Sequence, residues 1–164
     1  MGLLEPYGRY RGRSGQGLSI QLSDEPVIVV HGKEHAVAAL SAAAEADIAV
    51  LLVSQQGGVS VWGAEAFKAL MEQAVRQVPQ ARFRWALDCG DDPGYALAAC
   101  RTGVAGIVFA TTSAAFDRIA DIARQSGVAM FSPDVYQGKV LDLSQVGDTR
   151  AACDTFLIGD INCE

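Results

Sequence analysis

The sequence predicts a single α/β domain whose mostly parallel sheet has five or six strands alternating with helices. Its 164 residues are enough for one domain with a core of its own. Five short runs are almost entirely apolar, which is typical of strands buried on both faces. Helical periodicity separates these runs, so neighbouring strands are expected to be joined by crossovers and to lie parallel. The runs occupy residues 26–30, 48–53, 83–87, 106–109 and 128–131.

The segment 83–112 shows the boundaries of one strand–helix–strand unit most clearly. Its first apolar run ends in a polar cluster, after which Pro93 opens a helix and Gly103 closes it. Pro suits the first helical position because it has no N–H to lose there, and Gly accepts the left-handed turn beyond the helix end. Further helices are predicted at 34–46 and 64–78, where apolar side chains recur every three or four residues.

The chain divides into three parts. Residues 1–24 form an Arg- and Gly-rich arm, in which 18–22 alternate with period two and are expected to make a short edge strand. Residues 25–145 form the α/β domain, with one more short strand expected within 139–143. Residues 146–164 form an acidic C-terminal segment, whose apolar content is compatible with docking on the domain and with disorder.

Two arrangements of the sheet fit this pattern. One is an open sheet of flavodoxin type, and the other is part of a (β/α) barrel. A complete barrel needs eight units and about 250 residues, so the chain is too short for it. The open sheet is therefore favoured, with the partial barrel as the alternative.

Composition excludes several classes of protein. The formal net charge of −6 disfavours nucleic acid as the main partner, because an acidic protein repels phosphate backbones. No apolar run approaches the roughly twenty residues that span a bilayer. The charged N-terminus has no apolar leader segment, so a cytoplasmic protein is expected. The four cysteines have no C-x-x-C spacing, which predicts separate thiols and no metal site.

Ligands of both arrangements bind at the carboxyl ends of the strands. Asp88 follows a central apolar run, where a partly desolvated carboxylate suits general-base catalysis. His31 follows the first run and is the second catalytic candidate, with His35 one helical turn further on. A plainer interpretation is that Asp88 stabilises a turn while Asp91 or Asp92 caps the helix that begins at Pro93.

Five hydroxyl and amide side chains complete the candidate site. They are Ser54, Gln55, Thr111, Thr112 and Ser113. The last three stand between a strand and a helix, where hydroxyls and N–H groups can hold a phosphate. Capping of the helix by Thr112 or Ser113 would explain the same residues.

The layout resembles two known families. The stretch PGYALAACRTGVAGIVF, at 93–109, is similar to the 2-keto-3-deoxy-6-phosphogluconate aldolase type of phosphate-binding barrel. The resemblance implies five barrel units. However, Val53-Ser54 stand where that family has an acid, and no strand presents its Schiff-base Lys.

The layout also resembles response-regulator receiver domains, in which Asp88 would take the phospho-acceptor position and Thr111 or Thr112 the switch position. His31-Gly32-Lys33 replace the acidic pair that this family carries after its first strand. Ser132-Pro133 replace the Lys after the fifth strand. The aspartyl-phosphate chemistry of the family is therefore not expected here.

These gaps favour a non-catalytic interaction or self-associating module, with a homo-oligomer as the expected assembly. The Ala-rich helix at 36–46 would allow close packing on a partner, and Trp62 would be a natural anchor. The alternative is a binding protein or a lyase- or isomerase-type enzyme for a phosphorylated or carboxylated metabolite, with its site at the strand ends. The sequence predicts no particular cofactor.

Overall fold

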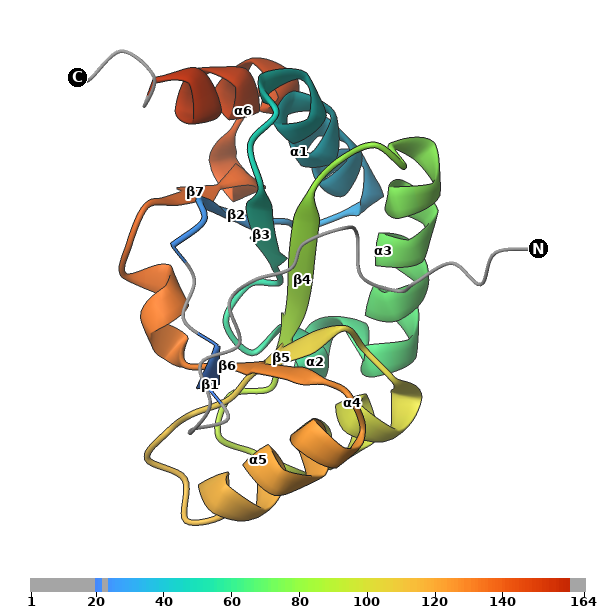
Figure 1. The fold of residues 1–164 in the computed structure, drawn as a ribbon, viewed down its shortest axis with the longest axis vertical. Coiled ribbons are helices and arrows are strands. Elements are labelled where there is room, and N and C mark those ends of the chain that lie inside the picture. The colour runs from blue at the N-terminus through green and yellow to red at the C-terminus, as the bar shows by residue number, and fades with distance from the viewer. Residues whose placement is uncertain (1–19, 22–23, 160–164) are drawn as a thin grey trace.

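The computed structural model describes residues 20–21 and 24–159. Most of the predicted arm, and residues 160–164 of the acidic segment, lie outside this part of the chain. The described residues form a single-domain α/β fold with an all-parallel sheet, as predicted (Figure 1). The strands are β1 (Ile20–Gln21), β2 (Val27–Val29), β3 (Val50–Val53), β4 (Phe83–Asp88), β5 (Gly106–Val108), β6 (Ala129–Phe131) and β7 (Val140–Asp142).

Helices follow the strands in alternation, as the periodicity indicated. Two helices were not predicted: the short α2, which lies where a loop was expected, and α6, which lies in the acidic C-terminal segment. The α-helices are α1 (Lys33–Ala46), α2 (Gly58–Trp62), α3 (Ala64–Gln77), α4 (Pro93–Thr102), α5 (Phe116–Gln125) and α6 (Thr149–Ile158). Two 3₁₀ turns, η1 (Pro133–Tyr136) and η2 (Leu143–Gln145), flank β7.

The sheet is open, and its strand order is β1-β6-β5-β4-β3-β2-β7. The five central strands follow one another in chain order, which is the order found in a (β/α) barrel. Because each right-handed crossover then advances the chain in the same direction, the helices are placed on one face of the sheet. Figure 1 shows that the sheet curls, so that β1 and β7 both lie on the same side of β4.

The sheet separates two apolar cores. The outer core lies between the sheet and the helices and contains Ile28, Leu52, Leu87, Ile107 and Met130 from the strands. The inner core lies on the other face, and a smaller set of strand residues forms it: Val27, Val29, Leu51, Val53, Ala86, Val108 and Phe131. Residues alternate between the two cores along each strand, because successive side chains point to opposite faces.

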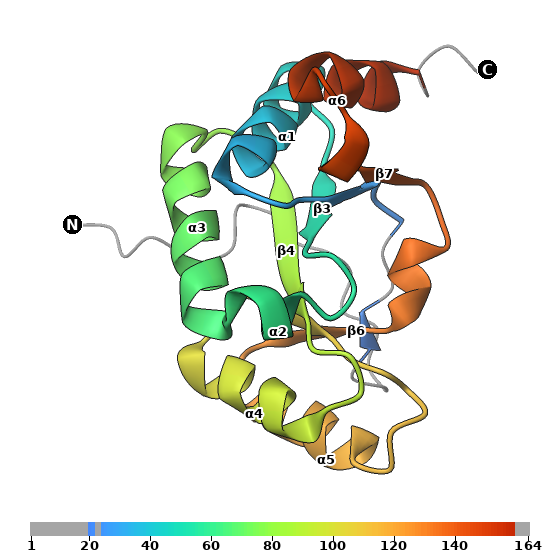
Figure 2. The same cartoon turned by 180° about the vertical axis from the view of Figure 1, so that it is seen from behind.

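The C-terminal segment docks on the domain as far as it is described. Helix α6 packs against α1, and Arg150 of α6 makes ion pairs with Glu45 of α1 and with Asp154 (Figures 1 and 2). Helix α1 also packs on α3. The small side chains of α1, Ala36, Ala39, Ala42 and Ala43, are consequently buried within the chain itself. They serve internal packing, so they do not offer a face for a partner.

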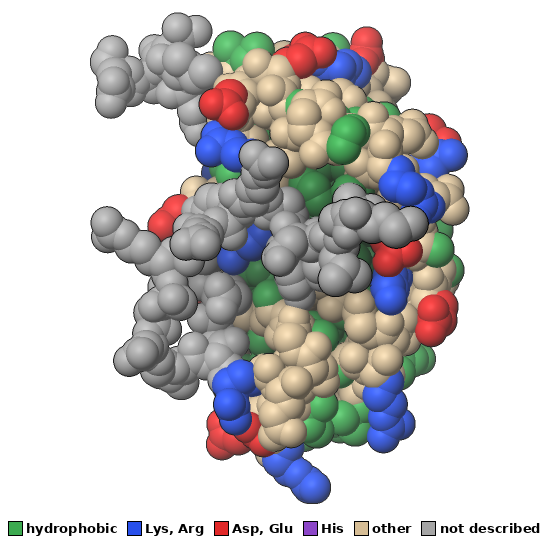
Figure 3. Space-filling view, turned by 45° about the vertical axis from the view of Figure 1, so that its right-hand side comes forward, with side chains coloured by type: hydrophobic (Ala, Val, Ile, Leu, Met, Phe, Trp, Pro, Cys, Tyr) green, Lys and Arg blue, Asp and Glu red, His purple; other side chains and the backbone are tan. Residues whose placement is uncertain are grey.

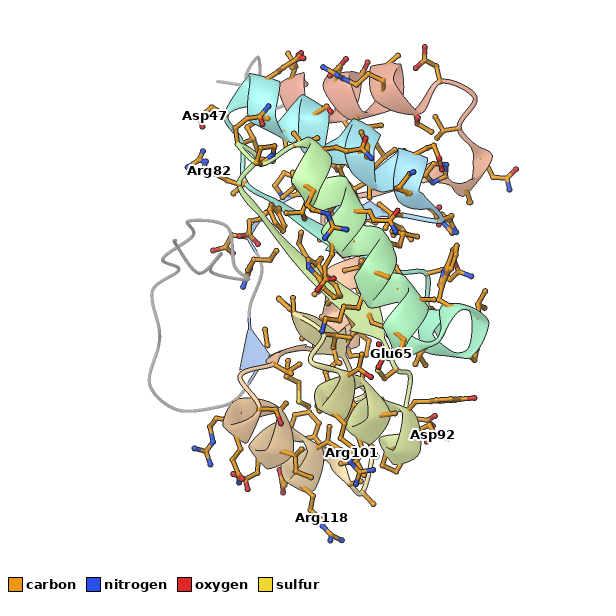
Figure 4. The ribbon with its side chains drawn as sticks, turned by 90° about the vertical axis from the view of Figure 1, so that its right-hand side faces the viewer. Asp47, Glu65, Arg82, Asp92, Arg101 and Arg118 are labelled. Carbon is orange, nitrogen blue, oxygen red and sulfur yellow. The ribbon has the colours of Figure 1, made fainter. Side chains whose placement is uncertain are left out.

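The rim where the strands begin and the rim where they end lie at opposite ends of helix α3. Figure 4 shows Asp47 and Arg82 beyond the C-terminal end of this helix, and Glu65 and Asp92 near its N-terminal end. Asp47 and Arg82 form an ion pair of 3.4 Å at the rim where the strands begin. The rim near Asp92 carries the strand ends. On the face shown in Figure 3, acidic and basic side chains are interspersed and do not gather into a patch of one sign.

Candidate functional site

Asp88 ends β4 and is held by three donors from the rest of the chain. Its side chain is buried, with 4% of the residue exposed. The backbone N–H groups of Gly57 and Gly90 donate to Oδ1, each at 2.9 Å. The hydroxyl of Tyr136 lies 2.9 Å from Oδ2. The carboxylate therefore fastens the loops after β3 and β4, together with η1, to the centre of the strand ends.

Ser54 follows β3 and is fully buried. Its Oγ accepts the backbone N–H of Asp88 at 2.9 Å and donates to the carbonyl of Gln55 at 3.0 Å. Its own carbonyl oxygen lies 2.9 Å from the Tyr136 hydroxyl. The hydroxyl of Ser54 is thus engaged inside the fold, whereas Gln55 is partly exposed.

The close approach of α2 explains a glycine at this point. A Cβ at Gly58 would lie 2.4 Å from Oγ of Ser54, a distance that real Cβ atoms do not show. Only glycine lets the first turn of α2 pass over Ser54.

His31 follows β2 and pairs with a carboxylate from the edge of the sheet. Its Nε2 lies 2.7 Å from Oδ1 of Asp142, the last residue of β7. Strand pairing brings the two together, because Val29 lies opposite Asp142 in the parallel register. Partial burial alone would raise the pKa of Asp142, but hydrogen bonds from the Ser144 N–H and from His31 outweigh it and lower that pKa. The His31 side chain keeps 22% of its surface exposed.

His35 supports His31 from the first turn of α1. The backbone N–H of His31 donates to Nδ1 of His35 at 3.2 Å. An accepting Nδ1 carries no proton, so His35 is a neutral imidazole protonated at Nε2. Burial, and next the nearby His31, lower the pKa of His35 and favour this neutral form. The two rings meet edge to face, with centroids 5.9 Å apart.

The inner face of the sheet brings the main polar groups together. Asp88 comes two residues after Ala86, and Asp142 comes two residues after Val140, and both Ala86 and Val140 face the inner core. Asp88 and Asp142 therefore face the same side of the sheet, where His31 pairs with Asp142. Two strand spacings separate β2 from β4, so His31 and Asp88 are about 10 Å apart across the strand ends. We call His31, Asp88 and Asp142 the inner end layer.

The hydroxyl residues that follow β5, at 111–113, are not part of the inner end layer. Thr111 and Thr112 are exposed, and the Oγ of Ser113 accepts the N–H of Ala115 at 3.3 Å. Helix α5 begins at Phe116 with Ala115 as its N-cap. The prediction that Thr112 or Ser113 caps this helix is therefore wrong, because one more turn intervenes. A phosphate site at 111–113 stays a prediction.

Asp92 caps α4 as the sequence indicated. Its Oδ1 accepts the N–H groups of Gly94 at 2.7 Å and Tyr95 at 3.2 Å. The neighbouring Cys89 is a buried thiol. Burial raises its pKa far above the ordinary value, and the adjacent Asp88 raises it further. A thiol held in this state is a poor nucleophile.

Two residues of the site were missed from the sequence, Tyr136 and Asp142. A signal existed for Asp142, because it lies near the end of the strand expected within 139–143, where candidate site residues were sought. Tyr136 lies in a 3₁₀ turn without periodicity, 48 residues from its partner Asp88. No pattern within the sequence links such a pair.

Three further findings bear on function. Within residues 20–21 and 24–159, no group of three or more His, Cys, Asp or Glu residues is placed to hold a metal ion. No helix of the described chain is long and apolar enough to cross a membrane. No protein-family model matches the sequence, and a search of curated proteins finds no match.

Proposed function

We propose that this domain binds a small polar metabolite at the strand ends, with His31 and Asp142 as its proton-transfer pair. The observation that carries the proposal is the 2.7 Å contact between His31 Nε2 and Asp142 Oδ1 on the inner side of the strand ends. A carboxylate that accepts from Nε2 fixes the imidazole tautomer and leaves the lone pair on Nδ1. This arrangement is that of a general base held ready for a substrate proton.

The polar groups of the site divide into two kinds. The side-chain oxygens of Asp88 and Ser54 already accept hydrogen bonds from other groups of the chain, so His31 is the better candidate for the general base. His31, Gln55, Thr111 and Thr112 retain exposed surface. The ligand that suits them is a phosphorylated or carboxylated metabolite. The resemblance to the aldolase-type barrel supports the location of this site and not a particular reaction.

A thermal-shift panel of phosphorylated sugars, keto acids and other small carboxylates tests the proposal. A ligand at a hundred times its Kd adds about 2.7 kcal/mol, which corresponds to a rise in Tm of roughly 5–10 °C for a domain of this size. The rise should be lost in His31→Gln and reduced in Asp142→Asn. It should persist in Asp117→Asn, which removes an exposed carboxylate from α5. A panel without any shift, or a shift unchanged in His31→Gln, would contradict the proposal.

The second candidate function is the non-catalytic interaction module, including self-association. Its support is an apolar pair on the rim: Val61 is 65% exposed and Tyr95 is 44% exposed. They belong to α2 and to the first turn of α4, which lie side by side in Figures 1 and 2. The buried indole N–H of the adjacent Trp62 has no hydrogen-bond partner within the described chain.

Light scattering over a range of concentrations tests this second function. A monomer has a mass of 17.3 kDa, so self-association would give a mass that rises with concentration. Val61→Ser should abolish the rise, whereas Ile158→Ser changes an exposed apolar side chain on α6 and serves as the control. A constant monomer mass would remove self-association as a function of this surface.

A further inference from the structure

The hydroxyl of Tyr136 carries one proton but faces two hydrogen-bond acceptors. Asp88 Oδ2 and the carbonyl oxygen of Ser54 each lie 2.9 Å from it. A phenol donates one hydrogen, so it cannot bond fully to both. The carboxylate takes the stronger, charge-assisted bond. The Ser54 carbonyl therefore receives only a weak hydrogen bond from the tyrosine.

Both acceptors belong to the rigid part of the fold. Oδ1 of Asp88 is tied by the N–H groups of Gly57 and Gly90, which fixes the direction of Oδ2. The carbonyl of Ser54 directly follows β3, next to β4 in the sheet. Two acceptors at fixed positions thus converge on one point.

The donor, in contrast, comes from outside the sheet. Tyr136 ends the four-residue turn η1, which begins with a cap from Ser132 Oγ to the N–H of Asp134. Its ring is only partly buried, and it packs on the inner core. A ligand could therefore take the place of the hydroxyl if η1 moves, without disturbing either acceptor.

We infer that Asp88 Oδ2 and the Ser54 carbonyl form a subsite for a primary ammonium group, which the Tyr136 hydroxyl occupies in this structure. An ammonium supplies three N–H donors and a positive charge, so it satisfies both acceptors and pairs with the carboxylate. The inference deepens the proposed function and rests on it for its biological meaning: it makes the metabolite an amine, with His31 about 10 Å away across the strand ends.

Tyr136→Gly provides the test, because it removes the phenol and leaves a space of the same shape. Three compounds with the same ring then differ chiefly in the group that reaches the acceptors. Toluene has no donor, p-cresol has one, and benzylamine carries an ammonium at neutral pH. The Tm should rise most with benzylamine, less with p-cresol and least with toluene. Adding Asp88→Asn should abolish the advantage of benzylamine, because the charge is gone.

Each other outcome overturns the inference. If p-cresol equals or exceeds benzylamine, the acceptors are suited to the tyrosine alone. If toluene raises the Tm as much as the other two compounds do, the acceptors do not select for a hydrogen-bond donor.

Should Tyr136→Gly fail to fold, Tyr136→Phe keeps the ring and removes only the oxygen. Ammonium chloride should then raise its Tm above the value in tetramethylammonium chloride of equal concentration. Equal values would refute the subsite. These experiments leave the His31–Asp142 pair intact, so the subsite and the proposed proton-transfer pair can fail independently.

Discussion

Replacement of Asp88 by Ala should be among the most damaging single changes in this domain. The carboxylate accepts two amide N–H groups and one hydroxyl, all at 2.9 Å, and it is buried. A hydrogen bond to a charged group contributes about 1.5–3 kcal/mol, and the loss of the acceptor leaves each buried donor unpaired. Because the three bonds share one acceptor, they do not add fully. We therefore expect a loss of about 4–5 kcal/mol in the free energy of unfolding.

Asp88→Asn is the matched comparison, because it keeps the shape and removes the charge. Its amide oxygen can still accept from Gly57 and Gly90. Its NH₂ group can donate to the oxygen of Tyr136, whose own proton then turns to the Ser54 carbonyl. The three donors that face Asp88 each keep a partner, and one N–H of the new amide is left over, so the expected loss is only about 1–2 kcal/mol.

Urea denaturation of the two variants separates these cases. With a slope near 2 kcal/mol per molar urea, the midpoint should fall by roughly 2 M for Ala and by less than about 1 M for Asn. A loss below about 1 kcal/mol for Asp88→Ala, or equal losses for both variants, would show that Asp88 does not hold the strand ends together.

Three further predictions follow from the same structure. Burial lowers the pKa of His35 below 6.5, so the stability that the neutral His35 contributes is complete above pH 6.5 and declines as the pH falls below that value. Urea midpoints measured at pH 7.5 and at pH 5.5 should show this decline in stability. The variant His35→Asn, whose Oδ1 can replace Nδ1 as the acceptor, should show a smaller decline between the two pH values. Gly58→Ala should cost about 2 kcal/mol or more by forcing Ser54 aside, whereas Gly138→Ala, with open space around its Cβ, should stay within about 0.5 kcal/mol in the same assay. Tyr136→Phe should lower the free energy of unfolding by about 2 kcal/mol, and a change below about 0.5 kcal/mol would show that its hydroxyl contributes little.

The regular part of the fold could be predicted because its signals are local. Runs of buried residues revealed the strands, and Asp92 and Pro93 correctly placed the start of α4. The strand order could not be predicted, because pairing of distant strands leaves no periodic trace in one sequence. The role of α1 was also out of reach: its Ala residues looked suited to a partner, and the partner is α6 of the same chain.

The positions of the candidate residues could be predicted only in part. The expectation that His31 and Asp88 lie at the ends of parallel strands is confirmed, and both residues lie on the same rim of the sheet. That expectation could not show that the hydroxyl of Ser54 is engaged inside the fold. Nor could it show that Asp88 has its donors within the chain, because Gly57 and Tyr136 lie 31 and 48 residues away from it.

Two side-chain contacts of the inner end layer depend on the segment 132–142, which follows the last regular strand–helix unit. Its first half, η1, brings Tyr136 to Asp88, and its second half, β7, brings Asp142 to His31. In a complete barrel, further strand–helix units would stand in this position. Here one short segment stands in their place and supplies both of these contacts at the strand ends. The proposed function therefore depends on this irregular stretch, while the helices and the outer core supply its rigid support.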